Sequence, residues 1–350
     1  MGADELPRAH GGPPLRGTLR ATPDDFFVDE DIGFVPDGVG EHALVRVEKR
    51  GANTEWVARQ LARFAGVEAN AVSYAGLKDR NALTRQTFSV HLPGKPDPDW
   101  PALAQDEFRV LEAHRHRRKL QRGALRGNAF TIVVRDAEGD AAALEQRIDA
   151  IRRQGIPNYF GEQRFGRGGD NVAQARAMFA GKRVQRHERG MLLSSARSHL
   201  FNAVLAERVR AGSWKHGLDG EVWMLSGSQS IFGPEPSSDA LQERCGRGDI
   251  APTGPMWGDG ELRSTGAVAI VEQAIGGANP DLVVGLAANG LRQERRALVL
   301  RPENLSLEWQ SARDLRISFD LNKGSYATVL LRELIDSSGM IGSGLIEQLE

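Results

Sequence analysis

The chain has 350 residues, of which 40% are hydrophobic and 26% charged, and its formal net charge is −1. This is the composition of a folded globular protein of about two domains, which excludes disordered and fibrous proteins. No run approaches the ~18 apolar residues of a membrane helix, and the first twenty residues lack the apolar core of a signal peptide, so we expect a cytoplasmic protein. Cys245 is the only cysteine, which excludes an internal disulfide framework and a thiolate-based zinc site.

The first 155 residues predict mainly strands. Residues 1–16 predict a loose lead-in, one helix is expected after Asn53 and another ending at Gly155, and Gly76–Leu83 predicts a polar loop. Alternating or β-branched apolar residues predict strands at Phe26–Ile32, Ala43–Val47, Ala71–Ala75, Thr84–Val90, Phe108–Ala113 and Ala129–Arg135.

Beyond Gly155 the pattern predicts a helical section, with Asn171 and Ser194 as caps of its first two helices. The predicted helices are Asn171–Gly181, Ser194–Gly212, Asp239–Arg244, Ala267–Ile275 and Asp281–Leu291. Strands return only after Arg296, and a last helix ends near Leu334. The strands predicted there are Leu298–Leu300 and Leu315–Leu321. Strands, then helices, then strands again indicate one α/β domain split by an insertion.

Basic residues are concentrated in the middle of the chain. Residues 113–135 contain seven Lys or Arg and no Asp or Glu, and residues 151–210 contain twelve against four. The first fifty residues are acidic, with six Lys or Arg against ten Asp or Glu. This segregation indicates a polyanion bound on one face. For charge alone, a solvated surface that binds nothing is an equal alternative, but the absence of counter-charges in 113–135 favours binding.

The motifs of several cofactor and metal enzymes are absent. There is no G-x-x-x-x-G-K-[ST] loop, no G-x-G-x-x-G that opens a helix after a strand, no H-E-x-x-H and no G-x-S-x-G. His114 and His116 lie in a basic run that repels a bound cation. If the protein is an enzyme, we therefore expect chemistry without a cofactor or a metal.

Five blocks have an unusual composition. They are Ala21–Glu30, Tyr74–Gln86 with Gly76-Leu77-Lys78-Asp79, Leu125–Phe130, Pro157–Gly166, and Leu321–Thr328 followed by Leu331–Leu334. At these blocks the sequence resembles the TruD family of tRNA pseudouridine synthases, in family order and spacing from about Leu19 to about Ser338. The combination is highly specific, whereas Gly-x-Lys-Asp alone is only moderately so.

The resemblance implies an α+β fold: a pseudouridine-synthase catalytic domain with a mixed, mostly antiparallel sheet, interrupted by a family-specific α/β insertion, the TRUD domain. The implied boundaries place the catalytic domain at 1–153 and 304–350 and the insertion at 154–303. The family converts uridine 13 in the D-arm of certain tRNAs to pseudouridine, so tRNA is the implied partner. We expect a monomer that needs no cofactor, membrane or obligate protein partner.

The reaction breaks the C1′–N1 bond and forms a C1′–C5 bond on the same base, which requires one carboxylate near C1′, as nucleophile or as base. Asp79 matches the family's catalytic aspartate. Without the resemblance, an Asp beside Lys and Arg is more often a surface residue. Arg20 matches a basic position, often lysine in the family, and is the expected partner that keeps Asp79 charged. Neighbouring residues in an extended segment point in opposite directions, so Lys78 should point away from Asp79. Lys78 is therefore expected to contact a phosphate.

The target uridine has to leave its stack, and aromatic side chains offset that cost. By resemblance, Phe26, Phe130 and Tyr326 line the uridine pocket, and Asn128 reads the uracil edge. Core packing is a serious alternative for Phe130. Phe27 is expected in the core.

The block Pro157–Gly166 lies at the junction into the insertion, where it forms either a hinge or a packing contact. We expect Phe160 and Phe165 to pack, and leave the role of Arg164 open.

Two other functions remain to be weighed. A non-catalytic RNA-binding module or RNA chaperone accounts for the basic surface and the aromatic residues, but has no use for Gly76–Asp79. A hydrolase that cleaves the glycosidic bond normally uses two carboxylates, and Asp79 has no obvious second. Retained binding without isomerisation in Asp79→Ala favours the enzyme over the module, and release of free uracil favours the hydrolase.

Overall fold

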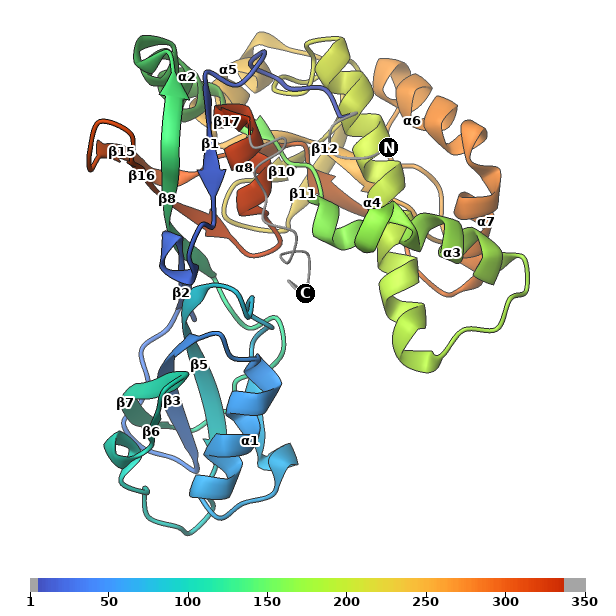
Figure 1. The fold of residues 1–350 in the computed structure, drawn as a ribbon. Helices are drawn as coiled ribbons and strands as arrows, with labels where there is room; N and C mark the ends of the chain where they lie inside the picture. The colour runs from blue at the N-terminus through green and yellow to red at the C-terminus, as the bar shows by residue number, and fades with distance from the viewer. Residues whose placement is uncertain (1–5, 337–350) are drawn as a thin grey trace. The chain divides into compact units, whose positions relative to one another are not determined.

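The structure, a computed structural model, describes residues 6–336 and forms two compact units (Figure 1). Unit 1 contains residues 6–14, Ala141–Arg301 and Ser325–Leu334, and unit 2 contains Leu15–Asp140, Pro302–Gly324 and residues 335–336. The boundaries predicted at 153/154 and 303/304 stay a prediction, while the compact units change at 140/141 and 301/302. Ser338, the end of the resemblance, lies outside the described residues.

Unit 2 is built, within the described residues, on an 11-stranded sheet of order β15-β16-β8-β2-β5-β3-β7-β6, with β1 beside β8 and β17, and β4 beside β5. Only the pairs β1–β17 and β2–β5 are parallel, so the predicted mixed, mostly antiparallel sheet is confirmed. Its strands are β1 Leu15–Leu19, β2 Phe26–Asp31, β3 His42–Arg50, β4 Val72–Tyr74, β5 Leu83–His91, β6 Ala104–Gln105, β7 Phe108–His116, β8 Gly127–Gly139, β15 Glu303–Trp309, β16 Leu315–Asn322 and β17 Ile335–Asp336.

Helix α1 (Thr54–Phe64) covers one face of this sheet beside β4 and β5 (Figure 1). Alternate residues of β3, Ala43, Val45 and Val47, are fully buried and join the core beneath α1. The next residue of this series is Lys49, which is also buried. A lysine therefore occupies a position that the alternation of β3 reserves for an apolar side chain.

Unit 1 contains a four-stranded antiparallel sheet of order β11-β10-β12-β13 and a layer of helices. The long helix α4 packs against α3, α6, α7 and β12, and buries Leu192, Ala196 and Leu200 among them. Its elements are α2 Ala141–Gln154, β9 Ile156–Pro157, α3 Asn171–Phe179, α4 Arg186–Arg210, β10 Glu221–Leu225, β11 Ile231–Glu235, α5 Asp239–Arg247, β12 Ile250–Met256, α6 Gly266–Ala278, α7 Pro280–Ala288, β13 Glu294–Ala297, β14 Val299–Leu300 and α8 Ala327–Leu334.

The prediction of a purely helical middle section was wrong, because β10 to β13 form a sheet there. Strand β12 contains Pro252 and Pro255, which count against a strand in the sequence. Strand β10 carries Glu221, whose buried carboxylate pairs with Arg208 of α4 at 2.9 Å. Neither feature can be recognised before the partner elements are in place. The α/β insertion implied by the resemblance agrees with this sheet.

Two predicted helix starts and the predicted end of the N-terminal lead-in were also wrong. Helix α4 begins at Arg186, two turns before the predicted Ser194, and Gln185 caps it as its N–H donates to Glu188 at 3.1 Å. Asp170 occupies the N-cap position of helix α3 without a side-chain cap bond, and Asn171 is the first residue of the helix. The predicted lead-in of residues 1–16 ends earlier, because β1 starts at Leu15 and pairs with β8 and β17. None of the helices in the described part combines the length and hydropathy needed to span a bilayer.

Candidate active site

Asp79 and Arg20 form a buried ion pair in unit 2. Arg20 Nη1 donates to Asp79 Oδ2 at 2.7 Å, and the backbone N–H of Asn81 donates to Asp79 Oδ1 at 2.9 Å. The side chains of Arg20 and Asp79 are 11% and 3% exposed. Burial lowers the pKa of Arg20, and the charge of Asp79 opposes that shift. The site thus holds one carboxylate with both oxygens fixed and a cation against one of them.

Arg20 is placed by an unusual backbone and by an aromatic ring. Its φ is +59°, in the left-handed region that non-glycine residues rarely adopt. Its guanidinium lies 3.9 Å from the centre of the Phe26 ring. A strained backbone persists only where the surroundings overdetermine it. Here the ring contact and the ion pair with Asp79 supply that restraint.

The loop before Asp79 is held by side chains from α1 and β5. The backbone N–H of Lys78 donates to Thr54 Oγ1 at 3.0 Å, Thr54 Oγ1 donates to Gln86 Oε1 at 3.1 Å, and Gln86 Nε2 donates to the carbonyl of Gly76 at 2.5 Å. Thr54 and Gln86 are buried. This chain of bonds joins the first turn of α1 to the loop, so the loop is a fixed part of the core edge.

Lys49 holds the same loop from β3. Its Nζ donates to the carbonyls of Ala52 at 2.9 Å, Asp79 at 3.0 Å and Lys78 at 3.4 Å. Burial lowers the pKa of Lys49 to about 8, with the Asp79 charge opposing the shift and the Lys78 charge adding to it. Sequence reasoning missed Lys49, and the signal was its place in the buried series of β3.

Lys78 lies in a buried polar chain. Its Nζ lies 2.9 Å from Glu30 Oε2 and donates to Asn128 Oδ1 at 2.5 Å, while Glu30 Oε1 accepts from the Thr87 N–H at 3.1 Å. Its predicted contact with a phosphate stays a prediction, but both partners of this ammonium belong to the protein. Glu30 was not foreseen, although it follows Phe26 and Val28 in the buried series of β2.

The predicted aromatic residues of unit 2 lie together. The rings of Phe26 and Phe130 meet edge-on at 6.3 Å, and Phe130 stacks on Phe319 at 5.2 Å. Both predicted residues are buried. Phe27, expected in the core, is half-buried, and its ring lies 5.1 Å from the Arg85 guanidinium. The structure therefore brings Arg20, Phe26, Lys78, Asp79, Asn128 and Phe130 into one unit.

Tyr326 belongs to unit 1. Arg164 Nε donates to its hydroxyl at 3.0 Å, and its ring lies 6.0 Å from that of Phe160. Arg164 also donates to Ser194 Oγ at 2.9 Å. Phe160 is buried against Phe201, as a packing role requires, whereas Phe165 is half-buried. The contact of Tyr326 with substrate stays a prediction.

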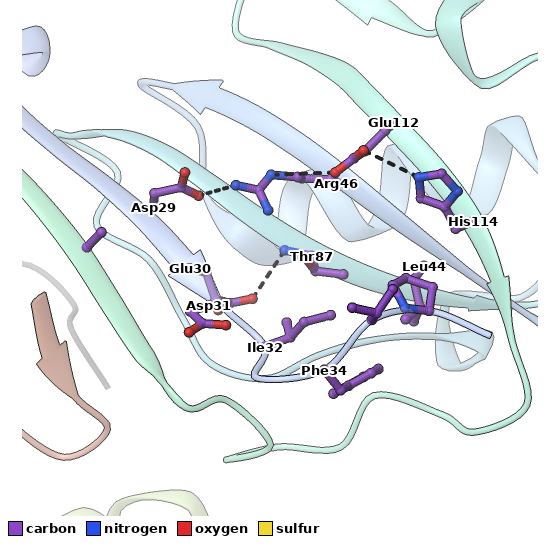
Figure 2. A pocket seen from close by; sticks show the side chains of 13 residues that line it. Asp29, Glu30, Asp31, Ile32, Phe34, Leu44, Arg46, Thr87, Glu112 and His114 are labelled. Atoms are coloured by element: carbon purple, nitrogen blue, oxygen red, sulfur yellow. Dashed lines mark hydrogen bonds and ion pairs between the residues drawn. The ribbon is translucent and has the colours of Figure 1, made fainter. Parts of the chain in front are cut away.

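A cavity of about 490 Å³ lies beside Glu30 in unit 2 (Figure 2). Figure 2 shows Arg46 between Asp29 and Glu112, with His114 beyond Glu112. Burial raises the pKa of Asp29, and the charge of Arg46 opposes this shift. The charged groups of this wall, Asp29, Arg46, Glu112 and His114, are paired with one another. This wall of the cavity therefore does not present a single unpaired carboxylate.

The basic segment between β7 and β8 exposes most of its charge. Exposed cations occur at Arg117, Arg118, Lys119, Arg122 and Arg126. By contrast, Arg115 is structural, since it donates to Asp97 at 2.9 Å and to the Lys95 carbonyl at 2.7 Å. The segment leads directly into Gly127 and Asn128 of β8. An exposed basic loop therefore adjoins the strand that carries two predicted substrate contacts.

Residues 6–336 contain no group of three or more His, Cys, Asp or Glu side chains placed to hold a metal ion. Burial raises the pKa of the Cys245 thiol to about 11, so this thiol is protonated at neutral pH.

The sequence comparisons with known proteins lead to one family. A family model described as tRNA pseudouridine synthase D (TruD) matches residues 8–173 and 170–334. Proteins named tRNA pseudouridine synthase D are similar: that of Xanthomonas axonopodis pv. citri is 52% identical over 95% of this chain and 94% of its own, and that of Methylococcus capsulatus is 46% identical over 96% and 95%. A crystal structure of a putative tRNA pseudouridine synthase D from Methanosarcina mazei has a TM-score of 0.71, 22% identity, and covers 93% of this chain and 95% of its own.

Proposed function

This chain belongs to the tRNA pseudouridine synthase D family, and we propose on that premise that it isomerises uridine 13 of the tRNA D-arm with Asp79 as its catalytic residue. The family supplies the enzyme class, a tRNA pseudouridine synthase. The site supplies the residue. We propose a reaction that uses neither a cofactor nor a metal ion.

The observation that carries this role is the buried ion pair of Asp79 with Arg20. In the isomerisation, the N1–C1′ bond breaks, the C1′–C5 bond forms, C5 loses a proton and N1 gains one, so no electrons enter or leave. A carboxylate that attacks C1′ and one that removes a ribose proton both have to be charged. Arg20 stabilises that charge, and the N–H of Asn81 fixes the direction of the carboxylate.

The base is proposed to lie against Phe26 and Phe130, with its edge at Asn128. Extruding a base costs a few kcal/mol, and one aromatic stack contributes about 1–3 kcal/mol. Phe26 is next to the catalytic pair through Arg20, and Phe130 lies two residues beyond Asn128 on the same face of β8. Both rings and the amide therefore lie on the paired strands β2 and β8, and the carboxylate lies in the loop before β5.

The exposed cations of 117–126 are proposed to bind tRNA phosphates. Phosphate contacts position a nucleic acid and account for most of its non-specific affinity. We further propose that the enzyme acts as a monomer in the cytoplasm, without an obligate protein partner.

The test is incubation of the purified protein, without added cofactor or metal, with an unmodified tRNA transcript, followed by mapping of pseudouridine at single-nucleotide resolution. We expect pseudouridine at position 13 with the wild type and none with Asp79→Asn, while tRNA binding changes less than about threefold. Asp149→Asn, an exposed carboxylate on α2, is the matched control and should retain full activity.

Other outcomes identify the competing functions. Binding without pseudouridine in the wild type indicates an RNA-binding module, and release of free uracil indicates a hydrolase. Wild-type rates in Asp79→Asn contradict the catalytic role of Asp79.

A further inference from the structure

Glu30, Lys78 and Asn128 form a series of polar contacts that allows the Asn128 amide only one orientation. Lys78 Nζ lies between Glu30 Oε2 at 2.9 Å and Asn128 Oδ1 at 2.5 Å. Glu30 is fixed in turn by the N–H of Thr87, which Figure 2 also shows. Glu30 and Asn128 are paired neighbours on β2 and β8. Backbone pairing and side-chain bonds therefore set this geometry together.

This arrangement determines the orientation of the Asn128 amide. An ammonium group has three donors and no acceptor, so only the amide oxygen can face Lys78. The amide nitrogen, Nδ2, then points away, and it has no hydrogen-bond partner among residues 6–336. Asn128 itself is half-buried. The side chain offers its surroundings a pair of N–H donors at a fixed place.

We propose that Lys78, held by Glu30, is a positioning residue that locks the Asn128 amide with its NH₂ group toward the substrate base, so that the site selects a pyrimidine with two ring carbonyls. The inference rests on the proposed function, in which Asn128 contacts the base. Lys78 acts through Asn128 and need not touch the RNA itself.

The chemistry of the reaction explains why a fixed donor suits uracil. To bring C5 to C1′ in place of N1, the detached base turns about the axis through N3 and C6. That turn exchanges O2 and O4, so a locked NH₂ group meets a carbonyl oxygen both before and after it. In cytosine the same turn exchanges a carbonyl with an amino group. A locked donor is then left against another donor in one of the two orientations, which costs binding in that state.

The test measures the effect of sulfur at the base edge, because a thiocarbonyl is a weaker acceptor than a carbonyl. Transcripts carry uridine, 2-thiouridine or 4-thiouridine at the target position, and kcat/KM is measured for each. With the wild type we expect a thio substitution to lower kcat/KM about three- to tenfold, the value of one hydrogen bond. In the double variant Lys78→Met/Glu30→Gln, which leaves no unpaired buried charge, the penalty should fall below about twofold.

Two further variants separate orientation from general damage. Lys78→Arg still has only donors, so it should keep the thio penalty even if its overall rate is lower. Asn128→Ala should abolish the penalty in either background. A purely structural role of Lys78 lowers every rate and leaves the ratio between substrates unchanged.

Equal thio penalties in the wild type and the double variant, with pseudouridine formed from the uridine transcript, overturn this inference alone. Failure of the wild type to form pseudouridine from the uridine transcript overturns the proposed function and this inference with it.

Discussion

At the scale of single residues, the position of Arg20 is restrained by three contacts or conformations that no sequence motif indicates. Its backbone is strained, its guanidinium lies over the Phe26 ring, and it forms an ion pair with Asp79. Removing one partner of a buried ion pair is costly because the other charge is left uncompensated.

We therefore predict that Arg20→Met lowers the free energy of unfolding by about 3 kcal/mol and lowers kcat/KM about a hundredfold, the scale of losing one electrostatic contact at a reacting centre. Urea unfolding and initial rates measure the two effects. Arg20→Lys keeps the cation and should stay within about tenfold of the wild-type rate. Full activity in Arg20→Met contradicts the proposed role of the pair.

The lowered pKa of Lys49 predicts that the free energy of unfolding depends on pH. Its pKa is about 8 in the folded protein against an ordinary 10.5, so between these values the unfolded chain binds more protons and this residue's contribution to stability rises with pH. The cost of burying the charged form is present below pH 8. Relative to Lys49→Met, the wild type should gain about 1 kcal/mol of unfolding free energy from pH 7 to pH 9. Urea unfolding of both proteins at the two pH values measures it, and a constant difference contradicts it.

The residues named from the sequence were those with a motif around them. Asp79 lies in a block of unusual composition and Arg20 lies directly before another, Ala21–Glu30, and the structure places the two residues together. Lys49 and Glu30 lie in ordinary strands, and their importance depends on partners far along the chain, Asp79 and Lys78. The sequence shows only that a charged residue lies in an alternating series of buried residues. This observation identifies a candidate site residue only once the partner of the charge is known.

At the scale of elements, two glycines predict opposite effects of the same substitution. A Cβ on Gly127 of β8 would lie 2.3 Å from the carbonyl oxygen of Leu321 in β16, whereas one on Gly190 of α4 meets nothing within 4 Å. We expect Gly127→Ala to lower the free energy of unfolding by about 1–3 kcal/mol. Gly190→Ala should raise it by up to about 1 kcal/mol. Urea unfolding measures both, and the same sign in the two variants contradicts the prediction.

The elements that the sequence predicted correctly are those whose pattern is local. Strand β2 and helix α1 were expected because their apolar spacing is complete within the segment. Strands β10 and β12 were missed because a buried Glu221 and two prolines are acceptable only beside α4 and the neighbouring strands. The early start of α4 was hidden by Gly190, which tertiary packing of the helix overrides.

At the scale of the whole molecule, the charge distribution predicts how tRNA binding depends on salt. Arg117 and Arg118 are exposed in the loop before β8, while Arg313 and Arg316, also in unit 2, are paired with carboxylates. Neutralising both residues of the first pair to Gln should reduce the slope of log K against log[salt] by about 2. Neutralising Arg313 and Arg316 should leave the slope unchanged. Equal slopes in the two double variants contradict a tRNA-binding role for this loop.

The connection from β8 to β16 has a consequence for synthesis on the ribosome. These strands pair from Gly127 to Val134, yet about 175 residues separate the end of one from the start of the other. At about 5–20 residues per second, translation of that stretch takes roughly 9–35 s. Arg20, Asp79 and Asn128 have all emerged by then, but Asn128 lies on a strand whose second neighbour does not yet exist. A nascent chain therefore carries Arg20, Asp79 and Asn128 long before its open strand edge is covered.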